Sequence, residues 1–423
     1  MATIGFTVEA SQLTMTDELI ELEAARRLVA ERVRPLATVR VPLREALGSV
    51  LAEEIVAPEN VPAFDNSAMD GYAIRAADTA GAGAASPVSL RVSGESRAGA
   101  PAASGLLAGE AIAISTGAVA PEGADAVVPV ERTTRRNGAV EVLAEAAPGA
   151  NIRRAGEDVA AGERVLAPGA VIGPAELGAI ASAARAEVAC AGRPRVSVLI
   201  SGDELIAPGE PMRPGAVRDS NAYTVPALAA QAGAELIHIE HVGDRAAATR
   251  AAIAAAFEAD VAVVCGGVSV GRHDHVRSAF AELGVERIFW GVALRPGKPT
   301  YFGVRPDGGL VFGLPGNPVS AMVTFLLFVR PALLAMQGRE PWPGTIPATF
   351  GADYAKKPGR AHALRCRLQP GPLSWVATPT KEQGSHVLTS MLGADGLAIL
   401  PGPAAGIGVG DRVDVELLPG AIG

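Results

Sequence analysis

Apolar positions along the chain divide it into regions of different periodicity. In the first region, about 16–56, the apolar residues between 22 and 29 recur at the spacing of a helix face, which predicts a helix-rich segment. From about 60 to 156, short Val- and Ile-containing runs alternate with Gly/Pro turns, as in a small β domain. Helical spacing returns at about 174–186, so we expect the first region and this one to form one domain that the β domain interrupts.

From residue 194 the pattern changes to repeated strand, loop and helix. The expected strands are 196–200, 236–239, 261–265, 287–290 and 310–314, and the expected helices are 222–232, 245–259 and 276–283. Strands that alternate with helices imply βαβ units and a mostly parallel sheet. The tail, about 342–423, again shows short strands with Pro/Gly punctuation and predicts a small β-barrel or sandwich.

The predicted fold class is therefore α/β plus β, in a multidomain chain. A central, mostly parallel α/β sheet domain is accompanied by a β-rich insert, a discontinuous helical N-terminal domain and a small C-terminal β-barrel. The predicted domains are 1–58 with 157–193, 59–156, 194–338 and 339–423.

Composition narrows the classes of function. With 423 residues and 49% hydrophobic content, the chain can build several cores. A net charge of −8 and only 4% aromatic residues argue against a nucleic-acid binder. Three widely separated cysteines offer no disulfide framework, and we find neither a signal peptide nor an apolar run long enough to span a bilayer. We expect a cytoplasmic protein that does not bind membranes.

The segment 62–73 concentrates polar chemistry between a proline and a glycine. Asp65, Asn66, Ser67 and Asp70 can all hydrogen-bond the local backbone, so the segment is typical of an ordered turn. Composition alone leaves two interpretations open, a solvated turn and a functional loop.

Polar loops also follow the predicted strands from residue 194 on. In an open α/β sheet, ligands bind outside the carboxyl ends of the strands. Five loops are expected at that edge: Ser201–Glu204, Gly243–Arg245, Gly266–Gly271 with Asp274, Arg295–Pro299, and Pro315–Ser320. One Gly-rich loop is weak evidence for a site, whereas five polar loops at one edge predict one.

These loops offer two complementary kinds of chemistry. Glu204, Asp244 and Asp274 are hard oxygen donors of the kind that hold Mg²⁺ beside a substrate phosphate, although Asp244 also fits a helix cap. The glycines of 266–271 and the helix start at Pro318 can present backbone N–H groups to an anion. Arg295 and Lys298 add positive charge in a chain with only four lysines.

Other common sites are not supported by the sequence. Gly266–Gly271 does not match the dinucleotide fingerprint GxGxxG, and Gly297-Lys298 continues with Pro299 rather than Ser or Thr, so it is not a P-loop. His273-Asp274-His275 lacks an evident third ligand for zinc. No Ser/His/Asp or Cys/His arrangement stands out.

Several of these loops occur in the order seen in one family. Its motifs here are Phe64–Tyr72, Ser115–Ala118, Arg154–Asp158, Gly202–Leu205, Gly266–Gly271, Pro315–Ala321 and Gln383–His386. The chain thereby resembles the MoeA family of molybdopterin molybdenumtransferases over nearly its whole length. The combination is far more specific than any single motif.

The resemblance implies a Mg²⁺-dependent enzyme of molybdenum cofactor biosynthesis. Its substrates would be molybdate and adenylylated molybdopterin, and its products would be molybdenum cofactor and AMP. A separate molybdopterin adenylyltransferase would supply the pterin substrate. It also implies a homodimer of four-domain subunits, with each active site shared between the α/β domain of one subunit and the β-rich domains of the other.

The resemblance and the loop chemistry together give the expected site residues. The expected catalytic residues are Asp65, Thr116, Glu204, Asp244 and Asp274, with Asp244 and Asp274 as metal ligands. The expected substrate-binding residues are Gly266, Gly267, Ser269, Gly271, Arg295, Lys298, Pro315, Gly316, Asn317, Pro318, Ser320, Arg365 and Ser385. Among these, Arg365 and Ser385 would lie on the molybdate side, and Asp70 is expected to brace the turn rather than meet substrate.

The chain departs from the family pattern at a few positions. Gly291 stands where family members often carry a lysine, which removes one cation, and Arg295 replaces a second lysine with its charge kept. Ser201 replaces a common threonine. Two alternative functions stay open on the sequence: a non-catalytic binding or scaffold protein with this fold, and an enzyme that inserts tungstate.

Overall fold

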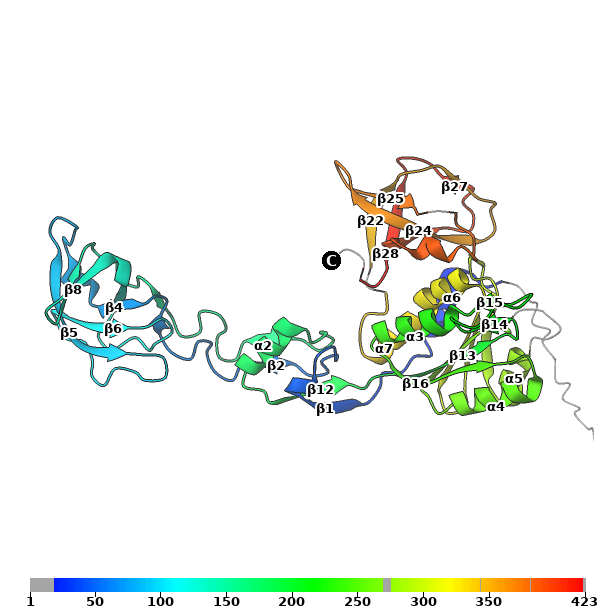
Figure 1. Cartoon of the computed structure of the whole chain (residues 1–423), viewed down its shortest axis with the longest axis horizontal. Helices are drawn as coiled ribbons and strands as arrows, with labels where there is room; N and C mark the ends of the chain where they lie inside the picture. Colours follow the sequence, from blue (N-terminus) through cyan, green and yellow to red (C-terminus); the bar gives the residue numbers. More distant parts are fainter. Residues whose placement is uncertain (1–18, 269–274, 343, 381, 421–423) are drawn as a thin grey trace, which may run out of the picture. The chain divides into compact units, whose positions relative to one another are not determined.

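The computed structural model describes residues 19–420 except 269–274, 343 and 381 (Figure 1). Packing divides the chain into two compact units, one made of Met1–Val39 with Ala191–Gly423 and the other of Arg40–Cys190. We call them unit 1 and unit 2. The finer division into four domains stays a prediction.

Unit 1 is built around a six-stranded sheet of order β16-β13-β17-β21-β20-β18. Strands β16, β13, β17 and β21 are parallel, whereas β20 runs antiparallel to both of its neighbours. The bounds are β13 Arg195–Ser201, β16 Glu235–Val242, β17 Val261–Cys265, β18 Glu286–Trp290, β20 Tyr301–Val304 and β21 Leu310–Leu314. The predicted, mostly parallel sheet is confirmed, with an antiparallel strand near one edge.

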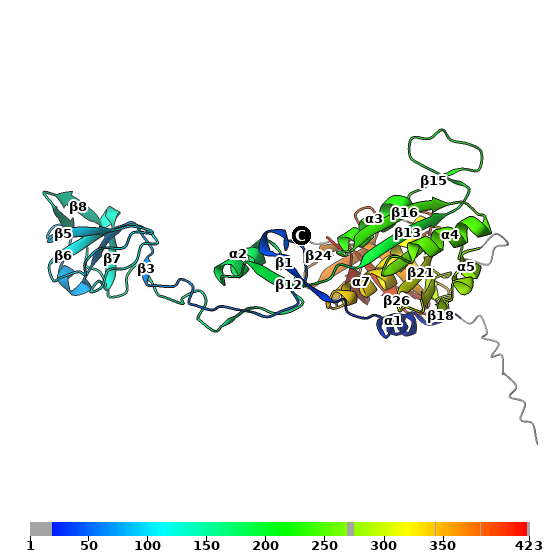
Figure 2. The same ribbon diagram turned by 90° about the horizontal axis from the view of Figure 1, so that it is seen from below.

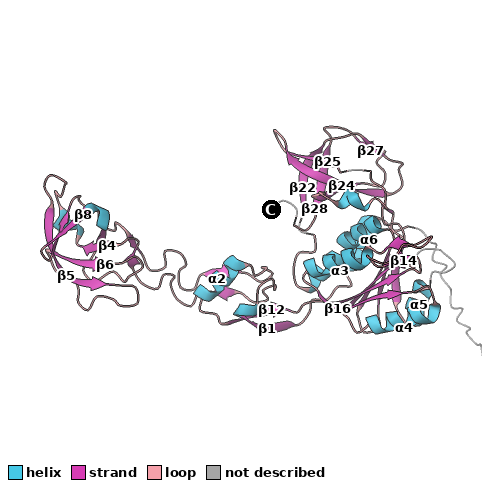
Figure 3. Ribbon diagram, in the orientation of Figure 1, coloured by secondary structure: helices cyan, strands magenta, loops and turns pink. Residues whose placement is uncertain are grey.

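Helices cover both faces of this sheet because side chains of a buried strand alternate between faces. Val196, Val198 and Ile200 of β13 pack in a core with helices α1, α3, α6 and α7, whereas Leu199 packs with α4 and α5. Figure 3 shows helices on either side of these strands. The helix bounds are α1 Leu22–Ala30, α3 Asn221–Gln231, α4 Ala246–Ala256, α5 Val276–Glu282, α6 Pro318–Thr324 and α7 Arg330–Met336.

Helices α6 and α7 are joined by a π-helical segment, η4 (Phe325–Val329). Pro331 lacks the N–H that an α-helix would need there, and a wider turn accommodates this defect. The whole run Pro318–Met336 is long and apolar enough to cross a membrane, with a mean hydropathy of 1.9, but 83% of that window is buried in the fold. It is therefore a core helix of unit 1, and it is longer than the apolar run seen in the sequence.

The C-terminal part of unit 1 is a closed five-stranded barrel, as predicted. Strands β24, β25, β22, β28 and β26 pair in that order, and β26 pairs back with β24. Short strand β19 (Leu294–Arg295), from the loop after β18, adds to β24. The bounds are β22 Thr345–Phe350, β24 Ala361–Pro370, β25 Trp375–Pro379, β26 Gly396–Leu400 and β28 Arg412–Leu417, with short strands β23 Tyr354–Ala355 and β27 Gly406–Ile407 and a 3₁₀ turn η5 Leu388–Met391.

A further pair of short parallel strands extends unit 1 between β13 and α3. Strands β14 (Leu205–Ile206) and β15 (Val217–Arg218) pair with each other, and Figure 2 shows the loop that connects them. This loop follows directly on the polar residues after β13.

Unit 2 contains a six-stranded sheet of order β7-β4-β6-β5-β9-β8 and three two-stranded pairs, β1-β12, β11-β2 and β10-β3. The β-rich insert is therefore confirmed. The strand bounds are β1 Thr38–Pro42, β2 Ile55–Val56, β3 Asn66–Ser67, β4 Gly71–Ile74, β5 Val88–Ser96, β6 Glu110–Ile114, β7 Ala126–Pro129, β8 Thr133–Arg136, β9 Ala139–Val142, β10 Ile152–Arg153, β11 Arg164–Leu166 and β12 Glu187–Ala191. The helices are α2 Pro174–Ser182 and the 3₁₀ turns η1 Leu43–Glu45, η2 Ala76–Thr79 and η3 Val130–Arg132.

The segment 16–56 holds less helix than the apolar spacing predicts. Within its described part, the α-helix ends at Ala30, and β1, η1 and β2 follow. Pro35 and Pro42 interrupt helical hydrogen bonding, and the β-branched residues Thr38, Val39 and Val41 favour a strand.

Candidate functional site

Polar loops meet at the carboxyl edge of the sheet in unit 1. Strands β16, β13, β17 and β21 are parallel, and β18 runs in the same direction because two antiparallel steps separate it from β21. The loops after these strands therefore leave from one edge of the sheet. They supply Ser201–Glu204, Gly243–Asp244, Gly266–Gly267, Pro315–Asn317 and Gly291–Lys298.

An acidic cluster forms where the loops after β13 and β16 meet. The backbone N–H of Asp244 donates to Asp203 Oδ1 at 3.1 Å, and Ser201 Oγ donates to Asp244 Oδ1 at 3.3 Å. The carboxylate of Glu204 folds back over Gly202, where a Cβ would lie 2.7 Å from Glu204 Oε2 and where φ is +150°. Glycine at 202 thus leaves room for the Glu204 carboxylate within the loop after β13.

The donor set around Asp244 fits a hard divalent cation in part. Both of its carboxylate oxygens accept only long hydrogen bonds, of 3.3 Å from Ser201 Oγ and 3.5 Å from Asp203 N, which leaves lone pairs available. The other expected metal ligand, Asp274, lies outside the described residues. Within the described residues, no group of three or more His, Cys, Asp or Glu side chains is arranged to hold a metal.

The turn after β17 requires glycine on steric grounds. Gly266 and Gly267 have φ values of +88° and +65°. A Cβ would lie 2.5 Å from Ser201 O at the first position and 2.5 Å from Val276 Cγ2 at the second. The backbone thus passes close to the loop after β13, in a conformation that L-residues rarely adopt. Ser269 and Gly271, which the sequence also assigns to substrate binding, lie outside the described residues.

The loop after β21 leads directly into helix α6. Asn317 precedes the helix, Pro318 is its first residue, and Ser320 is buried in its first turn. The side-chain amide of Asn221 donates to Gly316 O at 2.8 Å and fixes the turn. Pro315 is buried, whereas Gly316 and Asn317 are exposed at the edge of the sheet.

Two positively charged side chains in the loop after β18 have no carboxylate partner among the described residues. Arg295 and Lys298 are exposed, and neither side chain forms an ion pair with a described residue. Through β19, Arg295 lies beside His362 of the barrel strand β24. Burial, together with the positive charges of Arg295, Lys356 and Arg360, lowers the pKa of His362 to about 4, so the imidazole is neutral at pH 7.

The loop after barrel strand β25 brings Ser385 to the start of helix α6. Asn317 Nδ2 donates to Ser385 Oγ at 3.2 Å, and the backbone N–H of Val319 donates to Ser385 O, also at 3.2 Å. Ser385 therefore caps the helix with its carbonyl and places its hydroxyl beside Asn317.

Arg365 lies deeper than an anion-contacting residue would. Its side chain is fully buried, and its guanidinium donates to Ser390 Oγ at 3.1 Å, Ala363 O at 3.3 Å and Gly384 O at 3.2 Å. Burial without a carboxylate partner lowers its pKa to about 10. These contacts support a positioning role, in which Arg365 holds the loop that carries Ser385.

Asp65 and Thr116 lie in unit 2, where the turn 62–73 runs beside two other loops. Arg154 Nη1 donates to Asp65 Oδ2 at 2.5 Å, and the N–H of Ala155 donates to Asp65 Oδ1 at 2.8 Å. The Ala155 N–H and the Arg154 guanidinium lower the pKa of Asp65 below its usual range. The carboxylate is therefore ionised and fixed in orientation at neutral pH.

Asp70 braces the turn, as the sequence predicts. Its Oδ1 accepts hydrogen bonds from the backbone N–H of Thr116 at 2.7 Å and from Thr116 Oγ1 at 3.2 Å. The same contacts orient the Thr116 hydroxyl, which stays exposed.

Sequence reasoning missed Arg154 and Asp203 as individual residues. Both stand inside motifs that the sequence singles out, Arg154–Asp158 and Gly202–Leu205, so the signal was present. A motif does not say which of its carboxylates bonds a neighbouring loop, and only the fold reveals that Asp203 faces Gly243 and that Arg154 faces Asp65.

Known families match the chain in three successive blocks. The MoeA N-terminal region (domain I and II) matches residues 20–184, a probable molybdopterin binding domain matches 197–335, and the MoeA C-terminal region (domain IV) matches 347–418.

Named relatives are similar along nearly their whole length. Molybdopterin molybdenumtransferase 2 of Mycobacterium tuberculosis (strain CDC 1551 / Oshkosh) is 39% identical over 401 residues, covering 92% of this chain and 97% of the relative. Molybdopterin molybdenumtransferase of Haemophilus influenzae is 36% identical over 404 residues, covering 94% of this chain and 98% of the relative.

A solved structure shares the fold. The crystal structure of the molybdopterin biosynthesis MoeA protein from Pyrococcus horikoshii OT3 has a TM-score of 0.79 and 31% identity, covering 95% of this chain and all of that one. Fold, motif order and overall similarity agree, and the chain belongs to the MoeA family of molybdopterin molybdenumtransferases.

Proposed function

We propose that this transferase inserts molybdate into adenylylated molybdopterin and releases AMP, in a reaction that depends on Mg²⁺. The observation that carries the proposal is the convergence of carboxylates, a glycine turn and uncompensated cations at one edge of the sheet in unit 1. Such a set suits a substrate with several anionic groups and a phosphoanhydride to be cleaved. Relatives whose names specify molybdenum transfer to molybdopterin support the same reaction.

The described residues suggest a division of roles within the site. The glycine turn at Gly266 and Gly267 and the helix start at Pro318 would present backbone N–H groups to anionic oxygens. Arg295 and Lys298 would attract molybdate, a dianion, against the chain's net charge of −8. Ser385, held by Arg365 and Asn317, would offer a hydroxyl donor to a molybdate oxygen.

Asp244 and Asp274 would hold the Mg²⁺ ion, with Glu204 nearby. The bound ion would act as a Lewis acid on the phosphoanhydride of the adenylylated substrate. The carboxylates themselves would keep the ion in place, which accounts for their concentration in the loops after β13, β16 and β17.

Asp65 and Thr116 would complete the site from another subunit of a homodimer. Their loops are rigidly braced by Arg154 and Asp70 but belong to unit 2, which has its own core. In this proposal a separate adenylyltransferase supplies the pterin substrate, the enzyme works in the cytoplasm, and neither nucleic acid nor membrane takes part.

The direct test is an AMP-release assay with purified protein, adenylylated molybdopterin, molybdate and Mg²⁺. We expect AMP release that requires both molybdate and Mg²⁺ and stops when a chelator removes the metal. If AMP release does not respond to molybdate, the proposal fails and a binding or scaffold role is favoured. Replacing molybdate with tungstate in the same assay separates the two metal-inserting activities.

A further inference from the structure

Trp290, the last residue of β18, reaches with its side chain to the loop after a strand that is not its neighbour. In the order of the sheet, β21 and β20 separate β18 from β17. The indole N–H of Trp290 nevertheless donates to the carbonyl oxygen of Val268, in the loop after β17, at 2.8 Å. This hydrogen bond lies outside the backbone ladder of the sheet, and it links the end of β18 to the glycine turn.

The glycine turn of Gly266 and Gly267 is held on both sides. On one side, the N–H of Gly266 donates to Leu314 O at 3.0 Å. On the other side, Val268 is bonded to the indole, and its side chain is 1% exposed. A Cβ on Gly313 of β21 would come within 2.6 Å of Val268 Cγ1, so the two strand ends pack closely there. Gly267 therefore lies between two anchored residues.

The backbone N–H of Gly267 donates to no described residue. Gly267 is half-buried, and its φ is +65°. Because glycine can adopt many backbone conformations, the direction of this N–H depends on what holds the residues beside it. With the Gly266 N–H and the Val268 carbonyl both bonded, the Gly267 N–H has little freedom to turn. A backbone N–H with a fixed direction is what an anion site at such a turn requires.

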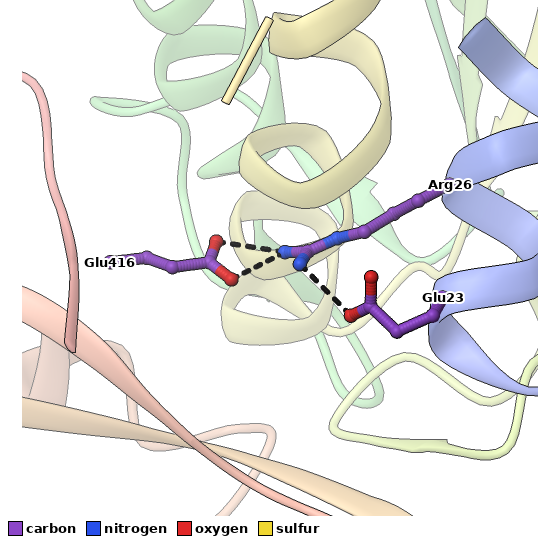
Figure 4. A network of polar contacts seen from close by, with 3 residues as sticks. All are labelled: Glu23, Arg26 and Glu416. Atoms are coloured by element: carbon purple, nitrogen blue, oxygen red, sulfur yellow. Dashed lines mark hydrogen bonds and ion pairs between the residues drawn. The ribbon is translucent and has the colours of Figure 1, made fainter. Parts of the chain in front are cut away.

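The indole of Trp290 is itself held by Arg277 of helix α5. The guanidinium carbon Cζ of Arg277 lies 4.1 Å from the centroid of the ring, which is the geometry of a cation–π contact. Arg26 of α1, by comparison, donates to the carboxylates of Glu23 and Glu416 (Figure 4). Arg277 forms no ion pair with a described residue, so no described carboxylate competes with the ring for its guanidinium. The stacking restrains the indole in the orientation of its hydrogen bond.

We propose that Trp290 is a positioning residue for the anion site of this transferase. Its indole N–H holds Val268, so that the Gly267 N–H keeps the direction in which it donates to an anionic oxygen of the adenylylated substrate. Trp290 acts through the glycine turn and does not itself touch the substrate. This role rests on the proposed function, because it concerns the glycine turn of the proposed site.

The test compares Trp290→Phe with the wild-type protein in the AMP-release assay. Phenylalanine keeps an aromatic ring beside Arg277 but lacks the indole donor. KM for adenylylated molybdopterin should rise at least about tenfold, as for the loss of a hydrogen bond to a charged oxygen, and kcat should change less than about twofold. KM for molybdate should stay unchanged, because that ion is assigned to Arg295, Lys298 and Ser385. A general loss of folded protein would lower the rate without separating the two KM values.

Two further variants isolate the hydrogen bond. Trp375→Phe is the matched control, because Trp375 is also half-buried but lies in barrel strand β25, and it should leave both KM values unchanged. Arg277→Met removes the stacking partner and keeps the indole donor, so KM for the pterin substrate should rise by a smaller factor, about twofold to fivefold. If Trp290→Phe does not fold, Arg277→Met provides the test.

Hydrogen exchange gives a readout that does not depend on turnover. The Gly266 N–H, which is bonded to Leu314 O, should exchange at least about tenfold faster in Trp290→Phe than in the wild-type protein or in Trp375→Phe, because the turn opens more often. Mass spectrometry of peptides that contain Gly266 measures this rate.

The results that overturn the proposed role of Trp290 are distinct from failure of the proposed function. An unchanged KM for the pterin substrate in Trp290→Phe overturns it, as does unchanged exchange at Gly266. An equal rise of both KM values overturns it because Trp290 would then act through its own loop. A larger rise in Arg277→Met than in Trp290→Phe overturns it because the guanidinium would then meet the substrate. If the wild-type protein releases no AMP in response to molybdate, the proposed function fails, and the role of Trp290 fails with it.

Discussion

Two carboxylates within six residues, Asp65 and Asp70, have different surroundings. Asp70 bonds the Thr116 backbone and hydroxyl, which is a bracing role within its own unit. Asp65 bonds Arg154 and the Ala155 N–H and remains partly exposed. The lowered pKa of Asp65 keeps it ionised, so it can meet a cationic or hydrogen-bond-donating group of a substrate complex at neutral pH.

Comparing Asp65→Asn with Arg154→Met separates substrate contact from bracing. Arg154 and Asp65 are both substantially exposed, so losing their ion pair should cost only about 0–1 kcal/mol of unfolding free energy. If Asp65 contacts substrate, Asp65→Asn should lower the rate of AMP release at least about tenfold, and Arg154→Met should lower it much less. Equal losses in the two variants would show that Asp65 acts only through its turn.

The pH dependence of stability gives a second check on this ion pair. Because the folded-state pKa of Asp65 is depressed, the small contribution of the Asp65–Arg154 pair to the unfolding free energy should vanish as pH falls through that pKa.

Arg365 shows that a sequence motif does not determine whether a side chain faces a ligand or the protein's own backbone. The resemblance assigns it to the molybdate side, and its residue type suits an anion. The fold instead buries the guanidinium and directs three of its donors to the barrel's own acceptors. Whether an arginine faces a ligand or a loop depends on packing around it, which no local pattern encodes.

At the level of elements, the strands of the α/β sheet were the most predictable. Four of the five expected strands between 196 and 314 begin and end within one residue of β13, β17, β18 and β21. For β13, β17 and β21 the reason is that continuous apolar runs between polar turns mark strands buried on both faces. Strand β16 is longer than predicted, because the apolar run that predicts it stops at the polar residues Glu235 and Glu240. The antiparallel strand β20 was missed because Tyr301–Val304 follows a proline-rich loop that the sequence assigns to a site.

Strand β24 carries a buried histidine whose titration should govern acid stability. His362 is 4% exposed, with Tyr354 Oη 3.1 Å from its Nδ1, and its folded pKa is about 4 against an ordinary value of 6.5. Between these values the unfolded chain binds more protons than the folded one, so stability falls as pH falls. The difference of about 2.5 pKa units corresponds to about 3 kcal/mol at most.

The prediction is checked by urea unfolding at a series of pH values between these two pKa values. The wild-type protein should lose more stability on acidification than His362→Gln, in which no buried imidazole can be protonated. His238→Gln, at a half-exposed histidine of β16, should follow the wild type. A parallel loss in His362→Gln and wild type would contradict the assignment.

For the whole molecule, the sequence predicted the order of β-rich, α/β and barrel regions but not how the chain packs into units. Helix α1 belongs to unit 1, with Leu22, Ala25 and Val29 in the main core beside β13 and α7. Sequence continuity placed this helix with the segments that follow it. Burial against β13 and α7, far along the chain, places α1 in the main core of unit 1, and such long-range contacts are invisible to local periodicity.

The two points at which unit 2 interrupts the chain of unit 1 lie next to each other within unit 1. The N–H of Gly192 donates to Ala37 O at 3.0 Å, and the N–H of Leu36 donates to Met336 O at 2.8 Å. The chain therefore leaves unit 1 and returns to it at adjacent backbone positions, both held by hydrogen bonds within that unit.

Unit 1 should accordingly fold without unit 2 when Ala37 is joined to Gly192 by a short Gly/Ser linker. We expect a cooperative thermal transition and the circular dichroism of an α/β protein, but no AMP release, because Asp65 and Thr116 are gone. An aggregated or non-cooperative product would show that unit 2 is required for folding.

The paired exit and entry points also bear on how this architecture can diversify. A host whose two chain ends are held side by side tolerates replacement of the intervening module, since the guest needs only termini at a matching separation. Recombination at this junction would replace the module that a neighbouring molecule meets, and it would leave the sheet edge of unit 1 and its carboxylates intact. The junction is thus a natural position for grafting a foreign domain or a reporter into an enzyme of this kind.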